Sequence, residues 1–221
     1  MESRETPEAE QPRLSHATIN YQVTAFSYLT IDNPTQGIYK EKGSKFLSFA
    51  YPVANESEVK ECLDFLRKKY FDARHHCYAY VLGADKIKFK AHDDGEPSHS
   101  ASDPILGQIR SKNLTNVLVV VVRYFGGVKL GVGGLMQAYK AAAEDAISYA
   151  GIVEVEVTKE IELKFEYARL PEVMRLVKDL ELKIVEQVFE QSCQLRALLK
   201  LRMDEAFQKQ VEYLKSMGIR C

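Results

Sequence analysis

The sequence predicts an α+β protein built from two unequal domains. Its 221 residues are enough for one large domain or two modest ones, since a domain usually takes ~100–200 residues. β-prone and helical segments alternate up to Gly151, and from about residue 158 the order becomes strand–helix–strand–strand–helix. We expect a first domain over residues 16–156 and a second over residues 157–221, after a disordered tail at residues 1–15 that lacks periodicity.

The charge of the chain is balanced as a whole but not locally. Thirty Lys and Arg oppose 31 Asp and Glu, for a net charge of −1, and 46% of the residues are hydrophobic, as in soluble globular proteins. This balance excludes a nucleic-acid-binding protein held by bulk charge alone. Residues 101–140 nevertheless carry one acidic side chain, Asp103, against five basic ones. Those five are Arg110, Lys112, Arg123, Lys129 and Lys140.

Three sequence features predict a cytoplasmic protein with no membrane partner. The longest apolar run, Val117–Val122, is far short of the ~20 residues that cross a bilayer. The acidic opening MESRETPEAEQPR contains no apolar stretch of the kind a signal peptide needs. The four cysteines show no CxxC spacing, so we expect reduced thiols. They are Cys62, Cys77, Cys193 and Cys221.

The first domain is predicted to open with extended segments and a helix. Ile19–Ile31 is β-prone, and residues 37–53 are predicted to form two strands around a turn at Lys42-Gly43-Ser44. Asn55 and Glu58 have the spacing of a capping box, which predicts the start of a helix. One apolar stripe with helical spacing supports it, formed by Val59, Cys62, Leu63, Leu66 and Tyr70.

A hairpin, a long loop and a central strand follow. Residues 77–82 and 87–91 are predicted to pair, whereas residues 92–104, HDDGEPSHSASDP, are too rich in turn residues for regular structure. Pro104 suits the first turn of a helix that runs to about Asn113. The uninterrupted VLVVVV within residues 116–125 predicts a strand that is buried on both faces and therefore central.

The glycine-rich stretch and the second domain complete the chain. Five glycines lie within residues 126–134, GGVKLGVGG, before a helix predicted over residues 135–149, which Gly151 is expected to close with a left-handed cap. Alternating patterns then predict strands. Pro171 is expected to open a helix, and Asp204 is expected to be the N-cap of the last helix. The strands are 152–157, 161–167, 183–190 and 193–202. From residue 158 onward this order fits a ferredoxin-like sandwich.

The glycine loop at residues 126–134 is the first candidate binding site. Backbone N–H groups between a buried strand and a helix lie at the positive end of the helix dipole, which suits phosphate or another anion. The spacing matches neither a P-loop nor a dinucleotide fingerprint. The alternative that the glycines only permit close helix–strand packing therefore stays open. An anion or nucleic-acid site here would use Arg123, Tyr124, Phe125, Gly126, Gly127, Lys129, Gly131, Gly133 and Gly134.

A second candidate is a polar cluster of His76, Asp93, Asp94 and Glu96. The three carboxylates could bind Mg²⁺ or Ca²⁺ or act as general acid and base, or they could cap backbone N–H groups of their own loop. Cys77 adjoins His76, but no second pair at zinc-ligand spacing exists, and adjacent strand residues point apart. We predict no metal and no cofactor, and we assign no catalytic residue.

Three blocks of sequence, taken together, resemble the IMPACT family in its bacterial two-domain form. They are HHCYAY at 75–80, DDGEPS at 93–98 and VVVVRYFGGVKLGVGGLMQAY at 119–139. The matching positions are His76, Cys77, Asp93, Asp94, Gly95, Glu96, Pro97, Arg123, Tyr124, Phe125, Gly126, Gly127, Leu130, Gly131, Gly133 and Gly134. Two departures stand out: residues 99–102 read His-Ser-Ala-Ser where the family has Gly-Thr-Ala-Gly, and Gln137 replaces an Arg.

The resemblance implies a fold and a cellular process. The first domain would be similar to the second domain of a small-subunit ribosomal protein, a βαβ sandwich with a left-handed crossover, against the usual right-handed rule. The second would resemble the ferredoxin-like C-terminal domain of elongation factor G. Eukaryotic relatives regulate translation by binding the activator of an amino-acid-starvation kinase. They carry a different N-terminal domain, so that role does not transfer directly.

Three functional hypotheses follow. The first is a translation-associated regulatory protein that binds RNA or the ribosome, with the local basic residues and the stacking-capable Tyr124 and Phe125 as its means. The second is a hydrolytic or metal-assisted enzyme whose polar cluster converges beside the glycine loop. The third is a protein–protein interaction module in translation control, in which the motif residues only determine the fold. Neither a membrane nor DNA is an expected partner, and catalysis ranks last.

Overall fold

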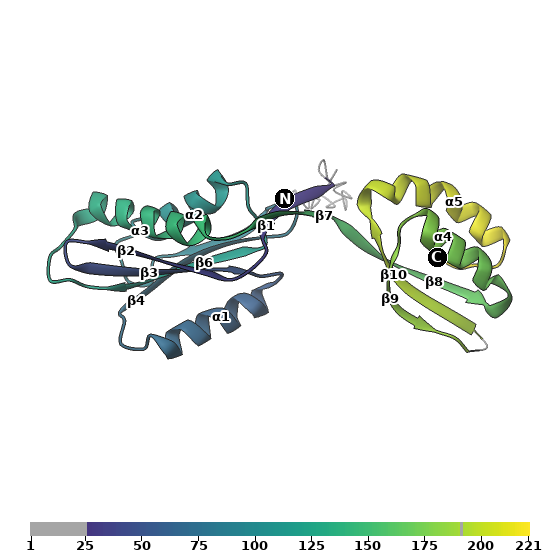
Figure 1. Ribbon diagram of the computed structural model, residues 1–221, viewed down its shortest axis with the longest axis horizontal. Helices are drawn as coiled ribbons and strands as arrows, with labels where there is room; N and C mark the ends of the chain where they lie inside the picture. The colour runs from purple at the N-terminus through teal and green to yellow at the C-terminus, as the bar shows by residue number, and fades with distance from the viewer. Residues whose placement is uncertain (1–25, 191) are drawn as a thin grey trace, which may run out of the picture.

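A computed structural model describes residues 26–190 and 192–221. The tail expected at residues 1–15 and the start of the β-prone opening at Ile19 lie outside the described residues. The chain forms a mixed α/β protein of two domains with antiparallel sheets (Figure 1). Among the described helices, none combines the length and the hydropathy needed to cross a membrane.

The first domain is built on a five-stranded antiparallel sheet with the order β2-β3-β6-β4-β5. Its strands are β2 (Thr35–Glu41), β3 (Ser44–Pro52), β6 (Val117–Tyr124), β4 (His75–Leu82) and β5 (Lys88–His92). The central place predicted for the VLVVVV strand is confirmed, because β6 pairs with both β3 and β4 and Val117–Val122 are fully buried. Since β3 and β4 both run antiparallel to β6, they are parallel to each other.

Helices cover both faces of this sheet. Helix α1 (Glu56–Lys69) packs on the face that carries Tyr78 and Tyr80, whereas α2 (Ser102–Ser111) and α3 (Gly131–Ser148) pack on the face that carries Cys77 and Ala79. Figure 1 shows α1 below the sheet and the other two helices above it. The period-2 alternation of a strand therefore decides which layer each residue of β4 enters.

The predicted capping box of α1 is confirmed. The Asn55 side chain accepts a hydrogen bond from the Glu58 backbone N–H at 3.0 Å, and the Glu58 carboxylate accepts one from the Ala54 N–H at 2.7 Å. The first bond satisfies an orphan donor of the first turn, and the second ties the residue before the cap back to the helix. Three basic residues in the last turn, Arg67–Lys69, complement the negative end of the helix dipole.

Several predicted element boundaries were wrong. Pro104 lies in the first turn of α2, as predicted, although the helix begins at Ser102, inside the stretch assigned to the loop. Helix α3 begins at Gly131, so Gly133 and Gly134 lie in its first turn instead of in a loop. Gly151 does not adopt a left-handed cap, because α3 ends in right-handed geometry at Tyr149. A Cβ at Gly151 would lie 2.6 Å from an Asp32 carboxylate oxygen, so close approach is what that position requires.

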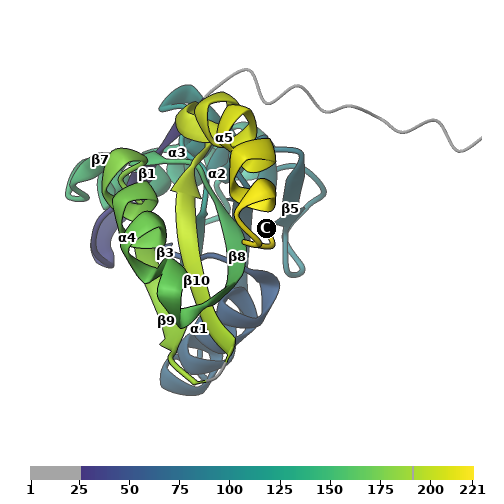
Figure 2. The same cartoon turned by 90° about the vertical axis from the view of Figure 1, so that its right-hand side faces the viewer.

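The second domain carries a three-stranded sheet with both helices on one face. The order is β8-β10-β9, from β8 (Thr158–Glu166), β10 (Ser192–Lys200) and β9 (Lys183–Val188). Helices α4 (Leu170–Asp179) and α5 (Asp204–Ser216) enclose a separate apolar core against it (Figure 2). Asp204 was expected to be an N-cap, but it is the first helical residue, makes no capping bond and pairs with Lys159.

A two-stranded ribbon joins the domains. Strand β1 (Ser27–Ile31) pairs antiparallel with β7 (Ile152–Glu156), and β8 starts two residues after β7 ends. Figure 1 shows this ribbon leading from the first domain toward the second, with the β2–β3 turn at the opposite extremity of the first domain. The residues singled out by the sequence lie at that far extremity.

Candidate binding site at one end of the first domain

Four chain segments meet where β6 ends and β4 begins. The strand register places His75 opposite Arg123 and Lys45 opposite Tyr124. The glycine loop turns back against the β2–β3 hairpin so closely that a Cβ at Gly126 would lie 1.9 Å from the carbonyl carbon of Gly43. No side chain fits at that contact, so glycine is required there for packing. This supports the packing alternative for one glycine without deciding the role of the others.

A buried hydrogen-bonded network lies beneath the site. Glu96 Oε1 accepts from Arg123 Nη1 at 2.6 Å and from the Tyr139 hydroxyl at 2.8 Å. The Arg123 and Glu96 side chains are only 7% and 4% exposed. Arg123 is therefore held mainly as an internal partner of Glu96, which differs from the free cation expected beside the glycine loop. Buried charges of this kind persist where they are paired and hydrogen-bonded.

Cys77 belongs to the same network and is held as a thiol. Its Sγ lies 2.9 Å from the carbonyl oxygen of Asp93 and 3.3 Å from the Tyr139 hydroxyl. Burial raises the pKa of Cys77 far above its usual range, so the thiolate needed by a nucleophile is not formed near neutral pH. His76 points to the opposite face of the sheet, as predicted from strand alternation.

Asp93 fixes the loop that carries Glu96. Its two oxygens accept hydrogen bonds from the backbone N–H groups of His99 at 2.9 Å, Ala101 at 3.0 Å and Ser102 at 2.8 Å. Burial raises the pKa of Asp93, but these N–H donors outweigh burial and the net pKa is lowered. Asp93 thus caps the start of α2, which is the capping alternative considered for this cluster.

Asp94 faces away from both Asp93 and Glu96. Its Oδ2 accepts from the His76 backbone N–H at 2.7 Å, and its Oδ1 lies 3.9 Å from Arg67. Burial lowers the pKa of His76, whereas the Asp94 carboxylate opposes that shift. His76 and Asp94 thus contact each other, whereas Asp93 and Glu96 each serve other partners, so the four residues of the polar cluster do not converge beside the glycine loop. Across residues 26–190 and 192–221, no group of three His, Cys, Asp or Glu side chains has metal-binding geometry.

The glycine loop itself leads into an open helix end. Gly127 and Gly131 have positive φ values of 88° and 71°, and α3 starts without a side-chain cap. Beside it lies a pocket of about 270 Å³ that Lys129 and Glu96 line together with apolar side chains. The remaining lining residues are Pro97, Arg123, Phe125, Leu130, Gly131, Val132 and Leu135. The anion-binding role of this loop stays a prediction.

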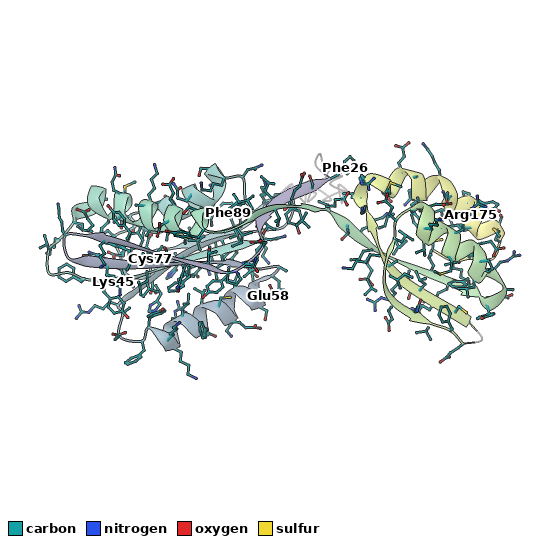
Figure 3. The ribbon with its side chains drawn as sticks, in the orientation of Figure 1. Phe26, Lys45, Glu58, Cys77, Phe89 and Arg175 are labelled. Carbon is teal, nitrogen blue, oxygen red and sulfur yellow. The ribbon has the colours of Figure 1, made fainter. Side chains whose placement is uncertain are left out.

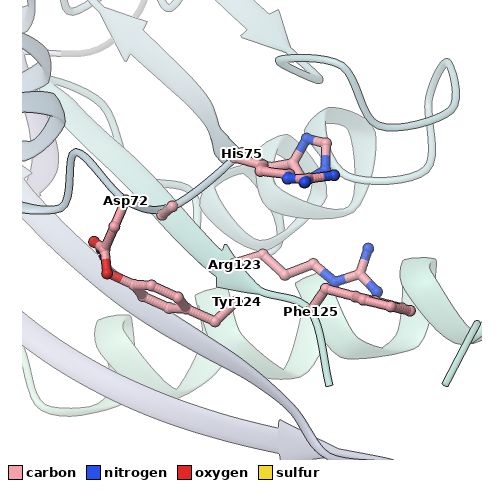
Figure 4. A pocket seen from close by; sticks show the side chains of 7 residues that line it. Asp72, His75, Arg123, Tyr124 and Phe125 are labelled. Atoms are coloured by element: carbon pink, nitrogen blue, oxygen red, sulfur yellow. Dashed lines mark hydrogen bonds between the residues drawn. The ribbon is translucent and has the colours of Figure 1, made fainter. Parts of the chain in front are cut away.

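On the other side of Arg123 lies a second pocket of about 420 Å³, here called the Arg123 pocket. Its lining consists of Asp72, Ala73, Arg74, His75, Arg123, Tyr124 and Phe125. Figure 4 shows the Arg123 guanidinium beside the Phe125 ring, with the Asp72 carboxylate at the Tyr124 hydroxyl. That hydroxyl donates to Asp72 Oδ1 at 2.8 Å. Burial and this bond together raise the pKa of Tyr124 to about 12.

The predicted basic patch proved to be dispersed, and a different one is present. Arg110 packs over the Phe89 ring with 4.3 Å between the guanidinium carbon and the ring centroid, so it belongs to the β5 side. The end of the domain around the two pockets instead carries eight exposed cations, here called the basic end; the position of one, Lys45, is labelled in Figure 3. They are Lys40, Lys42, Lys45, Arg67, Lys68, Lys69, Arg74 and Lys129.

Of these eight cations, only Lys129 belongs to the basic stretch predicted from the sequence. The signal was present in the run Arg67-Lys68-Lys69 and in the spacing of Lys40, Lys42 and Lys45. Three separate segments supply the charges, so only the strand register and the end of α1 bring them together. Apolar surface accompanies them, since Phe125, Val128 and Val132 are 58%, 52% and 54% exposed.

Comparisons with known proteins identify relatives over most of the chain. Residues 42–147 match the model of the Impact N-terminal domain. The IMPACT family member YigZ of Escherichia coli is 31% identical over 78% of this chain and 86% of its own length. YvyE of Bacillus subtilis is 29% identical over 82% and 83%, respectively. A crystal structure described as a hypothetical protein covers 89% of this chain and 96% of its own, with 28% identity and a TM-score of 0.70.

Proposed function

The chain belongs to the IMPACT family, and on that premise we propose that it is a translation-regulatory protein that binds the ribosome or RNA through its basic end. The observation that carries the proposal is the gathering of eight exposed cations and the exposed Phe125 ring around two pockets at one extremity. Cations that follow a phosphate backbone and an aromatic platform for bases are the two means by which proteins hold single-stranded RNA. The ribosomal-protein-like and elongation-factor-like folds implied by the family resemblance point the same way.

A binding role fits the geometry better than a catalytic one. The carboxylates considered as general acid or base are engaged within the chain: Asp93 by three backbone N–H groups and Glu96 by Arg123 and Tyr139. The Cys77 thiol is held protonated by burial. These groups stabilise the loop and the strand ends that carry the exposed cations and Phe125. Their role in this proposal is therefore to hold the binding surface in place, and not to catalyse a reaction.

The experiment is a titration of purified ribosomes and short single-stranded RNAs over a series of salt concentrations. We expect affinity to fall as salt rises, with a slope of log K against log salt of about 0.7 per neutralised phosphate. A variant carrying Lys42→Ala and Lys129→Ala removes two exposed cations and should lower the slope by about 1.4 if both contact phosphates. Arg123 is unsuitable for this test because its substitution disturbs the buried network.

The matched control removes two exposed cations from the second domain, by Lys178→Ala and Lys183→Ala. The net charge of the control equals that of the test variant, so a difference between them reports position and not bulk charge. Absence of binding at low salt, or equal slopes for the two variants, would contradict the proposal. Capture of a protein partner that survives nuclease treatment, without any RNA or ribosome binding, would favour the interaction-module alternative.

A further inference from the structure

We propose that the outer edge of β5 binds an extended segment of a second protein in which acidic and apolar residues alternate. The segment would pair with β5 and extend the five-stranded sheet. The inference goes beyond the proposed function, because it concerns a protein partner and a surface other than the basic end. Strand β5 (Lys88–His92) is the last strand of the sheet and pairs on one side, with β4. Figure 2 shows it at the periphery of the first domain.

The edge of β5 is open, whereas the other outer strands of the two larger sheets are covered or interrupted. In β2 the Ile38 N–H donates to Asp145 Oδ2 at 2.8 Å, and in β8 Lys164 exchanges two backbone hydrogen bonds with Arg220. The register of β9 shifts opposite Arg196, and such an irregularity blunts an edge. Within the described residues, no backbone group of β5 bonds to a segment other than β4. An edge left in this state is a template for strand addition.

The two faces of β5 differ in chemistry, because successive side chains point to opposite sides of a strand. Toward α1 the strand carries Lys88, Lys90 and His92. Toward α2 it carries Phe89 and Ala91, and the Phe89 side chain is 49% exposed. Residues of an added strand alternate in the same way and lie opposite residues of the same face. A segment with acidic residues on one face and apolar residues on the other therefore matches both faces of β5.

The positive charge on the α1 side is not fully neutralised within the chain. Lys60 and Lys90 line a groove of about 400 Å³ between α1 and the β4–β5 edge, and within the described residues neither forms an ion pair. The groove also contains Glu56 and Asp64, but the Glu56 carboxylate already pairs with Lys88 at 2.9 Å. Carboxylates of an added strand would enter this groove beside cations that have no other partner.

The same charges disfavour a second copy of this chain as the occupant. Two β5 edges paired antiparallel would place lysines opposite lysines, which is destabilising. Lysines on an edge protect a sheet from self-association in this way, and an acidic segment converts the repulsion into attraction. On the other face the Phe89 ring offers apolar contact beside Arg110, whose guanidinium carbon lies 4.3 Å from the ring centroid. The edge thus selects against its own copy and for an acidic, partly apolar strand.

The test measures fluorescence anisotropy of the full chain with a labelled peptide in which three glutamates alternate with two valines. We expect it to bind about tenfold more tightly than the matched peptide with lysines in place of the glutamates. A variant carrying Lys88→Ala and Lys90→Ala should weaken binding of the glutamate peptide about fivefold. Both side chains are exposed, so the melting temperature of this variant should equal that of the wild type.

The matched control is the variant with Lys42→Ala and Lys129→Ala, which removes two cations from the basic end and should bind the glutamate peptide as the wild type does. Loss of peptide binding in this control, with binding retained by the Lys88→Ala and Lys90→Ala variant, would overturn the inference, because the peptide would then lie on the basic end. Equal affinities of the wild type for the glutamate and lysine peptides, or no binding of either, would also overturn it.

Strand addition is separated from simple charge attraction by N-methylation of the peptide. Only alternate N–H groups of an added strand face β5, so methylation at both valines and methylation at the two outer glutamates should have unequal effects. One of these peptides should bind about tenfold more weakly and the other as the parent peptide does. Equal effects would overturn strand addition. The salt series with ribosomes and RNA is read independently of these peptides, so failure of this inference is distinguishable from failure of the proposed function.

Discussion

Two Arg–Glu pairs in this chain have the same contact distance and opposite surroundings. Arg123 Nη1 lies 2.6 Å from Glu96 Oε1, and Arg196 Nε lies 2.6 Å from Glu160 Oε1. In the first pair the side chains are 7% and 4% exposed, whereas in the second they are 40% and 49% exposed. Water screens the exposed pair and can solvate either partner alone, but it cannot reach a buried partner that has lost its counter-ion. Burial, and not distance, therefore decides what each pair contributes.

The largest effect should come from the buried pair. Glu96→Ala leaves the Arg123 guanidinium uncompensated and also removes the acceptor of the Tyr139 hydroxyl. We expect the free energy of unfolding to fall by about 3–5 kcal/mol, measured by denaturant titration of the full chain. Glu96→Gln keeps an acceptor without the charge and should lie between wild type and the alanine variant.

The matched control for this prediction is Glu144→Ala on the exposed surface of α3, where no ion pair is formed within the described residues. It should change stability by less than about 0.5 kcal/mol. Equal losses for the two alanine variants would mean that the network beneath the pockets does not hold this end of the domain together.

A smaller effect should follow from the Asp93 cap. Asp93→Ala removes three backbone hydrogen bonds at the start of α2 and should cost about 2 kcal/mol. Because the pKa of Asp93 is lowered in the folded protein, its contribution is present above the unfolded pKa of about 3.9. It is lost as the pH falls through the lowered folded value. Denaturant titrations from pH 6 to pH 2 should therefore show a steeper loss for wild type than for Asp93→Asn; parallel curves would contradict the assignment.

How much of this the sequence predicted depends on how far apart the interacting residues lie. The α1 cap was predictable because Asn55 and Glu58 are three residues apart, and the central strand because VLVVVV needs no partner to be recognised. The cap by Asp93 was one of three open alternatives, beside a metal site and a general acid or base. The Arg123–Glu96 pair spans 27 residues and depends on a loop path that no local pattern encodes.

The start of α3 and the basic end were missed for two different physical reasons. Glycine has low helix propensity, so residues 131–134 were assigned to a loop, although packing of the apolar face at Leu135, Ala138 and Tyr139 extends the helix through them. The basic end draws cations from the β2–β3 hairpin, from α1 and the turn that follows it, and from the glycine loop. Because these segments are far apart in the sequence, a charge count over any one stretch of the chain does not reveal the cluster.

The smallest effect belongs to the exposed pair, and it is the sharpest check on the comparison. Arg196 also contacts Glu186 at 2.7 Å, and the pKa of Arg196 is raised by its hydrogen bonds to Glu160 and Glu186. Because water replaces these partners readily, Arg196→Ala should leave the denaturation midpoint within the scatter of repeated wild-type measurements. A double-mutant cycle of Arg196→Ala with Glu160→Ala should give a coupling that shrinks further in high salt. A salt-insensitive coupling as large as that between Arg123 and Glu96 would show that exposure does not set the strength of these pairs. Contact distance alone would then determine the interaction energy of an Arg–Glu pair in both domains.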